Sequence, residues 1–193
     1  MEHDVKPYKQ RGMTCAIACM LMVLEYYKII PKANWRYEKK YDRCYRSRYM
    51  VGTPFSALAW HFAKNGLKTE LIHSEKELFV NHDFLPEKAF DLLIEEYKEY
   101  LKNAKEKGAV IKKGVFIDSN LLKEELKQNK LVILAGQIHN NLHAILLCGY
   151  EADSFIICDP LYKEKQRKTA EEIENFIDTK IGKWCICVRS DCD

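Results

Sequence analysis

The sequence lacks the features of a membrane, secreted or disulfide-stabilised protein. Its longest apolar run, Ala144 to Cys148 with its neighbours, is far shorter than the roughly 18 residues that a membrane-spanning helix needs. Eight cysteines in 193 residues fall well below the roughly 8–10% that is typical of a disulfide scaffold. The first residues, Met-Glu-His-Asp-Val, lack the basic and then apolar pattern of a secretory leader. We therefore expect a cytoplasmic protein with reduced thiols.

An excess of one charge and the common cofactor motifs are also missing. The 31 basic and 28 acidic side chains leave a net charge of +3, which is too small and too interspersed to favour nucleic acid or a membrane surface as the partner. No glycine-rich phosphate loop joins a strand to a helix, which argues against a nucleotide-binding doubly wound fold. No Cys-x-x-Cys pair occurs, so a zinc site that uses Cys185, Cys187 and Cys192 is disfavoured. We expect neither a metal nor an organic cofactor.

Composition and length instead describe an ordinary globular chain. Hydrophobic residues make up 47% and charged residues 31% of the sequence. A chain of 193 residues is long enough to build a packed core and too short for two full domains. The sequence therefore predicts one domain over residues 1–193.

Hydrophobic patterning predicts helices in the first part of the chain. The segment Thr14 to Ile29 is almost entirely apolar, which indicates a buried helix with Thr14 as its N-cap. Residues 34–50 are basic and rich in tyrosine without a clean period, so we expect a surface loop with short helical pieces. A second helix is expected from Pro54, with Thr53 as its N-cap, to about Lys64.

The rest of the chain predicts a sheet with three further helices. Helices are expected over 86–106, from a cap at Asp118 or Ser119 to 128, and from Thr169 to about 177. Strands are expected over 67–72, 131–135, 143–149, 155–158 and 183–188. Helices followed by an antiparallel set of strands and one late helix define an α+β fold.

Cys15 is the first candidate for chemistry, because it falls in the first turn of the predicted buried helix. Free backbone N–H groups and the positive end of the helix dipole favour a thiolate at such a position. The alternative is that Cys15 is a small core residue, which its position alone favours.

Three other residues suggest a catalytic partnership for this thiol. If the strands 143–149 and 155–158 form a hairpin, Asp159 lies beside His143 and can orient its imidazole. Gln10 lies five residues before Cys15, near enough to offer its amide as an oxyanion donor. His61 and His139 are alternative bases, and His139 is the main rival because it lies only four residues from His143.

The segments around Gln10, Cys15, His143 and Asp159 together resemble the papain-like peptidases that cut double-glycine leader peptides from bacteriocins. The resemblance implies a papain-like α+β fold, a Cys15 nucleophile, His143 as general base and acid, Asp159 as orienter and Gln10 as oxyanion donor. It also implies a peptide or acyl substrate. The matching segments are Gln10–Ala18, Gly52-Thr53, Lys64–Leu67, His143–Ile145 and Asp159-Pro160.

The sequence departs from that family at three points. Ala16 follows the nucleophile where the family usually has glycine, Gln10 is five residues upstream where six is more usual, and residues 74–115 resemble a helical insertion. Relatives of this fold include acyl-transferring and inactive members. The alternatives are therefore an inactive peptide-binding module and, more weakly, a redox sensor that uses Cys15 and Cys19.

Overall fold

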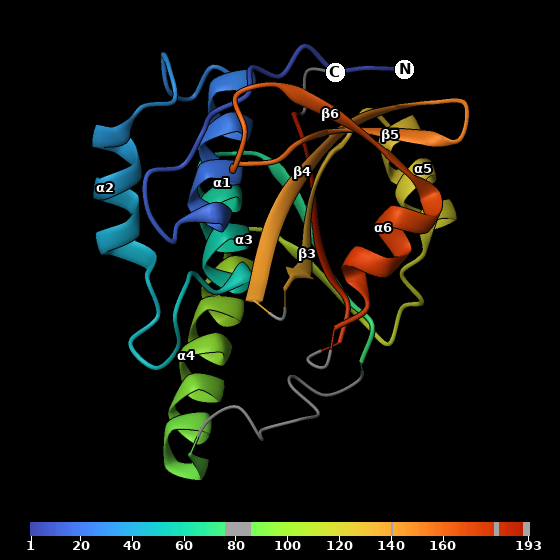
Figure 1. The fold of residues 1–193 in the computed structure, drawn as a ribbon. Coiled ribbons are helices and arrows are strands. Elements are labelled where there is room, and N and C mark those ends of the chain that lie inside the picture. Colours follow the sequence, from blue (N-terminus) through green and yellow to red (C-terminus); the bar gives the residue numbers. More distant parts are fainter. Residues whose placement is uncertain (76–85, 140, 180–181, 191–193) are drawn as a thin grey trace.

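The protein folds as a seven-stranded sheet with helices on both faces (Figure 1). The structure is a computed structural model and describes residues 1–75, 86–139, 141–179 and 182–190. Part of the predicted insertion, residues 76–85, and Cys192 lie outside the described residues. The strands are β1 (Lys68–His73), β2 (Val110–Lys113), β3 (Leu131–Ile138), β4 (Asn141–Glu151), β5 (Ser154–Cys158), β6 (Lys165–Thr169) and β7 (Trp184–Arg189).

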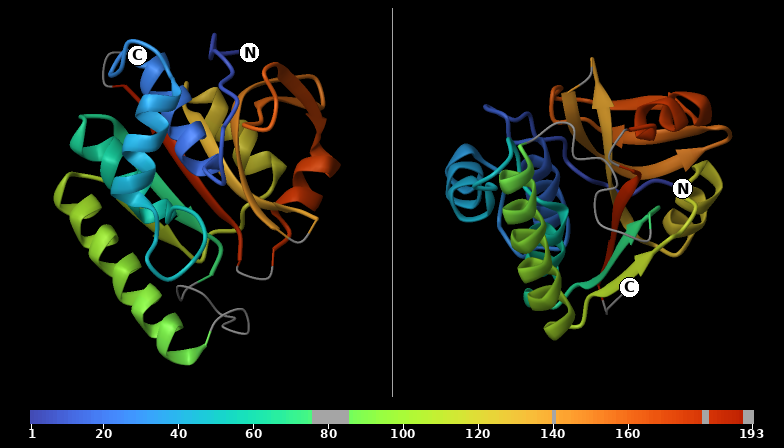
Figure 2. Two further views of the ribbon diagram at one scale, coloured as in Figure 1. Left: turned by 60° about the vertical axis from the view of Figure 1, so that its left-hand side comes forward. Right: turned by 90° about the horizontal axis from the view of Figure 1, so that it is seen from below.

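The strand order is β2-β1-β7-β3-β4-β5-β6, and every neighbouring pair except β1 and β2 is antiparallel. The helices are α1 (Cys15–Tyr26), α2 (Trp35–Tyr45), α3 (Phe55–Lys64), α4 (Glu87–Glu106), α5 (Ser119–Lys127) and α6 (Ala170–Ile177). Helices α1, α3 and α4 lie on one side of the sheet with α2 outside α1, and α5 and α6 cover the other side (Figures 1 and 2). The expected α+β arrangement is confirmed.

Strand alternation gives each face of the sheet its own core. Along β4, Ala144 and Leu146 belong to the core under α1, whereas Ile145 and Leu147 belong to the core under α5 and α6. Successive strand residues point to opposite faces, so one apolar run supplies both cores. This explains why β3, β4 and β7 are apolar along nearly their whole length.

Helix α1 is the predicted buried helix, and its residues from Ala16 to Leu24 are all buried. It ends at Tyr26, three residues earlier than expected. Thr14 is its N-cap residue, but its side chain makes no capping bond and donates instead to a carboxylate of α2. A helix that is apolar on all sides needs cover on all sides, which the sheet and α2 provide.

The prediction for residues 34–50 is wrong, because Trp35–Tyr45 forms the helix α2. Asn34 caps this helix by accepting bonds from the backbone N–H groups of Arg36 and Tyr37. Tyr37, Tyr41 and Tyr45 stack at a spacing of four residues, with ring centroids 6.2 Å apart. That tyrosine stripe is the helical period, which the surrounding lysines and arginines obscure.

The remaining expectations hold with small shifts. Helix α3 starts at Phe55 with Pro54 as its N-cap, one residue later than predicted. Asp118 is the N-cap of α5 and accepts a bond from Leu121 N–H. Strands β2 and β6 are additional, and they form the two edges of the sheet. In the described ranges, no helix has the length and apolar character that crossing a bilayer requires, and the cytoplasmic location stays a prediction.

Candidate active site

Cys15 is the first residue of α1 and is half-buried. The first four backbone N–H groups of a helix have no partner inside the helix, so they point toward any group placed at this end. The positive end of the helix dipole lies at the same place. Local structure therefore gives the thiol the environment that the sequence predicts.

His143 and Asp159 are brought together by the predicted hairpin. Strands β4 and β5 pair antiparallel with Leu146 opposite Cys158, which sets the start of β4 beside the end of β5. Nε2 of His143 lies 2.8 Å from Oδ1 of Asp159, and both side chains are only 8% exposed. The same carboxylate oxygen accepts a bond from Leu161 N–H at 2.9 Å, which holds it in place.

Cys15 completes this arrangement from the side of α1. Cys15 and His143 line one pocket. Burial lowers the pKa of His143, but hydrogen bonds and charge interactions with Asp159 and Cys15 outweigh burial and raise this pKa to about 9. Because Asp159 engages Nε2, the remaining ring nitrogen, Nδ1, is the one available to exchange a proton with the thiol. The contacts with Asp159 and Cys15 thus favour the charged form of the His143 imidazole.

Gln10 lies beside the hairpin end, although its amide faces its own loop. Its backbone N–H donates to the carbonyl of Pro160 at 2.8 Å. Its Nε2 donates to the carbonyl of Gly12 at 2.6 Å, and its buried Oε1 has no hydrogen-bond partner among the described residues. The structure brings Gln10 to the loop before Cys15, and its role as oxyanion donor stays a prediction.

Glu38 of α2 holds this loop from outside, a role that the sequence analysis missed. Glu38 is 4% exposed, and its carboxylate accepts bonds from Tyr8 Oη, from Arg11 N–H at 2.9 Å and from Thr14 Oγ1. These three donors span the segment that leads into Cys15. No sequence signal identified Glu38, because its importance depends on α2 being a helix that packs here.

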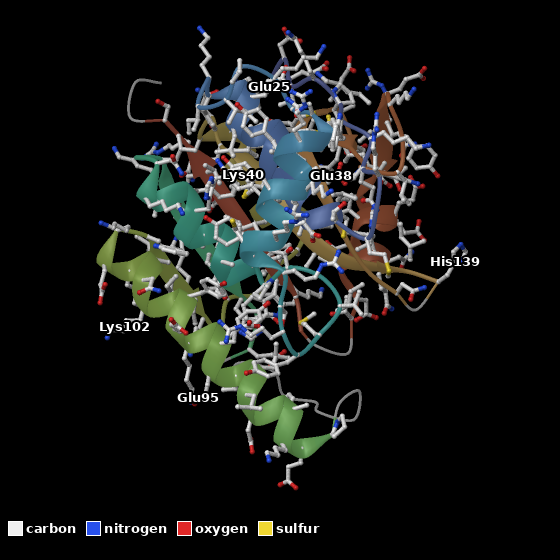
Figure 3. All side chains as sticks on the ribbon, turned by 90° about the vertical axis from the view of Figure 1, so that its left-hand side faces the viewer. Glu25, Glu38, Lys40, Glu95, Lys102 and His139 are labelled. Atoms are coloured by element: carbon white, nitrogen blue, oxygen red, sulfur yellow. The ribbon has the colours of Figure 1, made fainter. Side chains whose placement is uncertain are left out.

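The rival residues lie elsewhere. His139 is exposed in the turn after β3 and points away from the molecule (Figure 3). His61 is buried in α3 and bonded to Tyr45 Oη at 2.7 Å, and burial lowers its pKa to about 3. Cys19 is buried one turn below Cys15. Burial, with the nearby Cys15 and Asp159, raises the Cys19 pKa well above its ordinary value, which counts against a redox pair with Cys15.

A small pocket of about 80 Å³ opens beside Cys15 and His143, and we call it the Cys15 pocket. Its mouth carries Val51 and Leu142, which are 65% and 45% exposed. Its buried part includes Tyr97 of α4 and Trp184 of β7. The other lining residues are Ala16, Met50, Gly52, Thr53, Phe55, Ala135, Gly136 and Ala144. Apart from His143, none of the lining side chains carries a charge, so the pocket suits a small uncharged group.

The comparisons with known proteins point to one family. Residues 2–185 match the model of the Peptidase_C39 like family. The chain belongs to this family. A search of the curated proteins finds no match for this Peptidase_C39-like chain.

Two solved structures resemble this Peptidase_C39-like chain over nearly its whole length. One is a double glycine motif protease from an AMS/PCAT transporter in complex with the leader peptide, at 18% identity and a TM-score of 0.54, covering 98% of this chain and 94% of the other. The second is the peptidase domain of Streptococcus ComA, a bifunctional ABC transporter, at 15% identity and a TM-score of 0.51, covering 97% and 99%. At these identities the likeness shows the fold, and the predicted papain-like peptidase fold is confirmed.

Metal ligands do not gather around this site. Within the described ranges, no group of three or more His, Cys, Asp and Glu side chains is placed to hold a metal ion. Seven cysteines in these ranges are free thiols. The site offers the thiol of Cys15, the imidazole of His143 and the carboxylate of Asp159, and these groups suit acyl chemistry.

Proposed function

We propose that this chain is a cysteine peptidase that acts on a peptide with small residues at the cleavage site, in the manner of leader-peptide processing. The observation that carries the proposal is the contact of His143 with Asp159 at 2.8 Å on one side and its interaction with Cys15 on the other. The membership of the Peptidase_C39 like family supports the same class of reaction.

In the proposed reaction, the Cys15 thiolate attacks the carbonyl carbon of the peptide bond. The C–S bond forms, and the electron pair of the carbonyl moves onto its oxygen. Backbone N–H groups at the start of α1, with Gln10 as an additional donor, stabilise that oxyanion. Binding of the oxyanion requires the Gln10 amide to turn away from the Gly12 carbonyl that it contacts here.

The intermediate then collapses with proton transfer by His143. The C–N bond breaks and the imidazolium gives its Nδ1 proton to the leaving amine. Water next attacks the thioester, neutral His143 takes the proton of that water, and the C–S bond breaks to restore the thiolate. Asp159 holds the ring orientation and stabilises its positive charge throughout. A bound amine in place of water would give acyl transfer by the same steps.

The substrate side of the proposal rests on the Cys15 pocket. A space of about 80 Å³ without charged lining residues other than His143 accommodates glycine, alanine or serine more readily than larger side chains. The similar AMS/PCAT protease was solved in complex with a leader peptide. A leader peptide with small residues before its cut is therefore the substrate class that we propose.

The test is cleavage of synthetic leader peptides that end in Gly-Gly, followed by mass spectrometry. We expect cleavage after the second glycine by the native chain and none by Cys15→Ala. Circular dichroism serves as the control that this variant is folded. Cleavage that persists in Cys15→Ala, or a preference for bulky residues before the cut, would overturn the proposal.

A peptide-binding module without turnover is the second candidate. It is favoured by Ala16, which restricts the backbone after Cys15, and by the engagement of Gln10 with Gly12. This candidate expects the same leader peptides to bind with equal affinity to the native chain and to Cys15→Ala, without a cleaved product. Calorimetric titration of both proteins distinguishes the two functions.

A further inference from the structure

The Cys15 pocket is closed by a residue from the long helix α4, which belongs to the segment 74–115 that the sequence analysis interpreted as an insertion. Tyr97 lies at the middle of α4 and lines the pocket together with Cys15 and His143. Helix α4 therefore contributes to the lining of the candidate active site.

The position of Tyr97 is fixed on two sides. Its ring lies 5.6 Å from the ring of Trp184, measured between centroids, at an interplanar angle of 60°. Its hydroxyl oxygen accepts a bond from the backbone N–H of Phe55 at 3.2 Å, at the start of α3. Tyr97 is only 6% exposed. Because a neighbouring ring and a hydrogen bond hold the large Tyr97 ring in place, this ring is a rigid part of the lining of the Cys15 pocket.

We propose that Tyr97 is a specificity-determining residue that sets the depth of the Cys15 pocket. This inference rests on the proposed function and goes beyond it by naming the group that excludes bulky side chains. Val51 and Leu142 form the exposed mouth, whereas Tyr97 and Trp184 form the buried end. A substrate side chain that enters past the mouth meets these two rings.

Of the two rings, Tyr97 is the one that can change without disturbing the sheet. Trp184 begins β7, which pairs with both β1 and β3, so a change there disturbs the sheet itself. Lining residues such as Ala16, Ala135 and Ala144 are already small and leave little to remove. Shortening Tyr97 therefore deepens the pocket directly.

The experiment compares Tyr97→Ala and Tyr97→Leu with the native chain on two sets of probes. The first set is a series of peptides in which each residue before the cut is in turn glycine, alanine, leucine or phenylalanine. At one position of the series, we expect Tyr97→Ala to raise kcat/KM for leucine relative to glycine by roughly tenfold or more, since a few methylene groups change recognition by that much. Tyr97→Leu should give a smaller increase at that same position.

The second set of probes works without turnover. It compares alkylation of Cys15 by iodoacetamide with alkylation by N-benzyl iodoacetamide, detected by mass spectrometry. We expect the native chain to disfavour the benzyl reagent and Tyr97→Ala to raise the ratio of benzyl to plain alkylation several-fold. This ratio decides on Tyr97 even if the native chain cleaves no peptide, so failure of the proposed function remains a separate outcome.

Two control variants separate pocket depth from general loosening. Leu93→Ala removes a fully buried side chain one turn earlier on α4, outside the pocket lining, and should change neither ratio. Tyr97→Phe removes only the hydroxyl that bonds Phe55 and should keep the native selectivity. An equal change in Leu93→Ala, or unchanged ratios in both Tyr97→Leu and Tyr97→Ala, would overturn the proposal.

Discussion

At the scale of single residues, the charge state of His143 links the site to pH. Its pKa is raised to about 9 in the folded chain, against about 6.5 for an unperturbed histidine. A group whose pKa is raised by folding stabilises the native state below its unfolded pKa, and this contribution disappears as pH rises through the folded value. The relevant window therefore runs from about pH 6.5 to pH 9.

We predict that the difference in unfolding free energy between the native chain and His143→Ala is larger at pH 6 than at pH 10. The change is expected to be on the order of 3.5 kcal/mol at most, because the folded and unperturbed pKa values differ by about 2.5 and a pKa difference of one corresponds to about 1.4 kcal/mol. Urea unfolding at several pH values measures it. A difference that stays constant between pH 6.5 and pH 9 would contradict a charged His143 that interacts with Asp159 and Cys15.

The reactivity of the Cys15 thiol gives a second measure of its interaction with His143. We expect iodoacetamide to label Cys15 faster than Cys44 at pH 6, because Cys15 lies at the start of α1 beside the His143 imidazole, and thiols in such surroundings are the more reactive ones. Cys44 is exposed and serves as an internal control in the same sample. Substitution His143→Ala should remove the advantage of Cys15 and leave Cys44 unchanged. Equal labelling of both cysteines in the native chain would count against the pair.

Asp159 is expected to act through His143. Asp159→Asn keeps the shape of the side chain but removes the negative charge that raises the His143 pKa. We predict a fall in kcat of about 10²–10⁴-fold, the range for losing the orienting carboxylate of a triad. In a plot of the Cys15 alkylation rate against pH, the rise on the acidic side should shift in this same variant that loses kcat. A variant with native kcat would exclude this role.

At the scale of elements, α2 supports the loop that leads into α1. Its Glu38 carboxylate accepts three hydrogen bonds from residues 8–14. The backbone of this loop has to keep its conformation for Cys15 to face His143. Glu25 is a suitable comparison, since its carboxylate accepts a bond from Ala33 N–H at 2.7 Å away from the site. Both glutamates are labelled in Figure 3.

We predict that Glu38→Gln lowers kcat by roughly tenfold and the free energy of unfolding by about 1.5–3 kcal/mol, the usual worth of hydrogen bonds to a charged group. Glu25→Gln should lower stability through the same kind of bond and leave kcat unchanged. Hydrogen exchange of the Arg11 amide should accelerate only in Glu38→Gln. If both variants lose activity in proportion to stability, the loop has no special role.

The elements also show what the sequence can and cannot predict. The proximity of His143 and Asp159 could be predicted because strand alternation and a hairpin are local patterns, and the family resemblance added Cys15 to them. Edge strand β2 was missed because it is only four residues long, Val-Ile-Lys-Lys, and edge strand β6 was missed because its sequence, Lys-Gln-Arg-Lys-Thr, is polar. Both become strands through pairing with β1 and β5. Tyr97 and Glu38 were missed because their roles depend on where distant helices pack.

At the scale of the whole molecule, the sequence predicts a single domain, and we propose that the segment around α4 is part of its folding unit. Strand β2 extends the sheet beside β1, and α4 packs on α3. Trp60 of α3 lies 5.7 Å from Tyr100 of α4, measured between ring centroids. Figure 2 shows α4 alongside the other helices on that side of the sheet.

This proposal predicts one cooperative unfolding transition in which α4 and α1 take part together. Leu101→Ala removes a buried side chain of α4 and should lower the unfolding free energy by about 2–5 kcal/mol. Tryptophan fluorescence, which reports on Trp35, Trp60 and Trp184, and far-ultraviolet circular dichroism should shift to the same new midpoint with an unchanged m-value. Leu122→Ala in α5, on the opposite face of the sheet, should move the same two signals together, because strands such as β4 serve both cores. The contrary result would be two separate unfolding transitions, of which only the earlier one responds to Leu101→Ala. In that case the α4 segment unfolds independently, and the Cys15 pocket loses Tyr97 from its lining before the sheet unfolds.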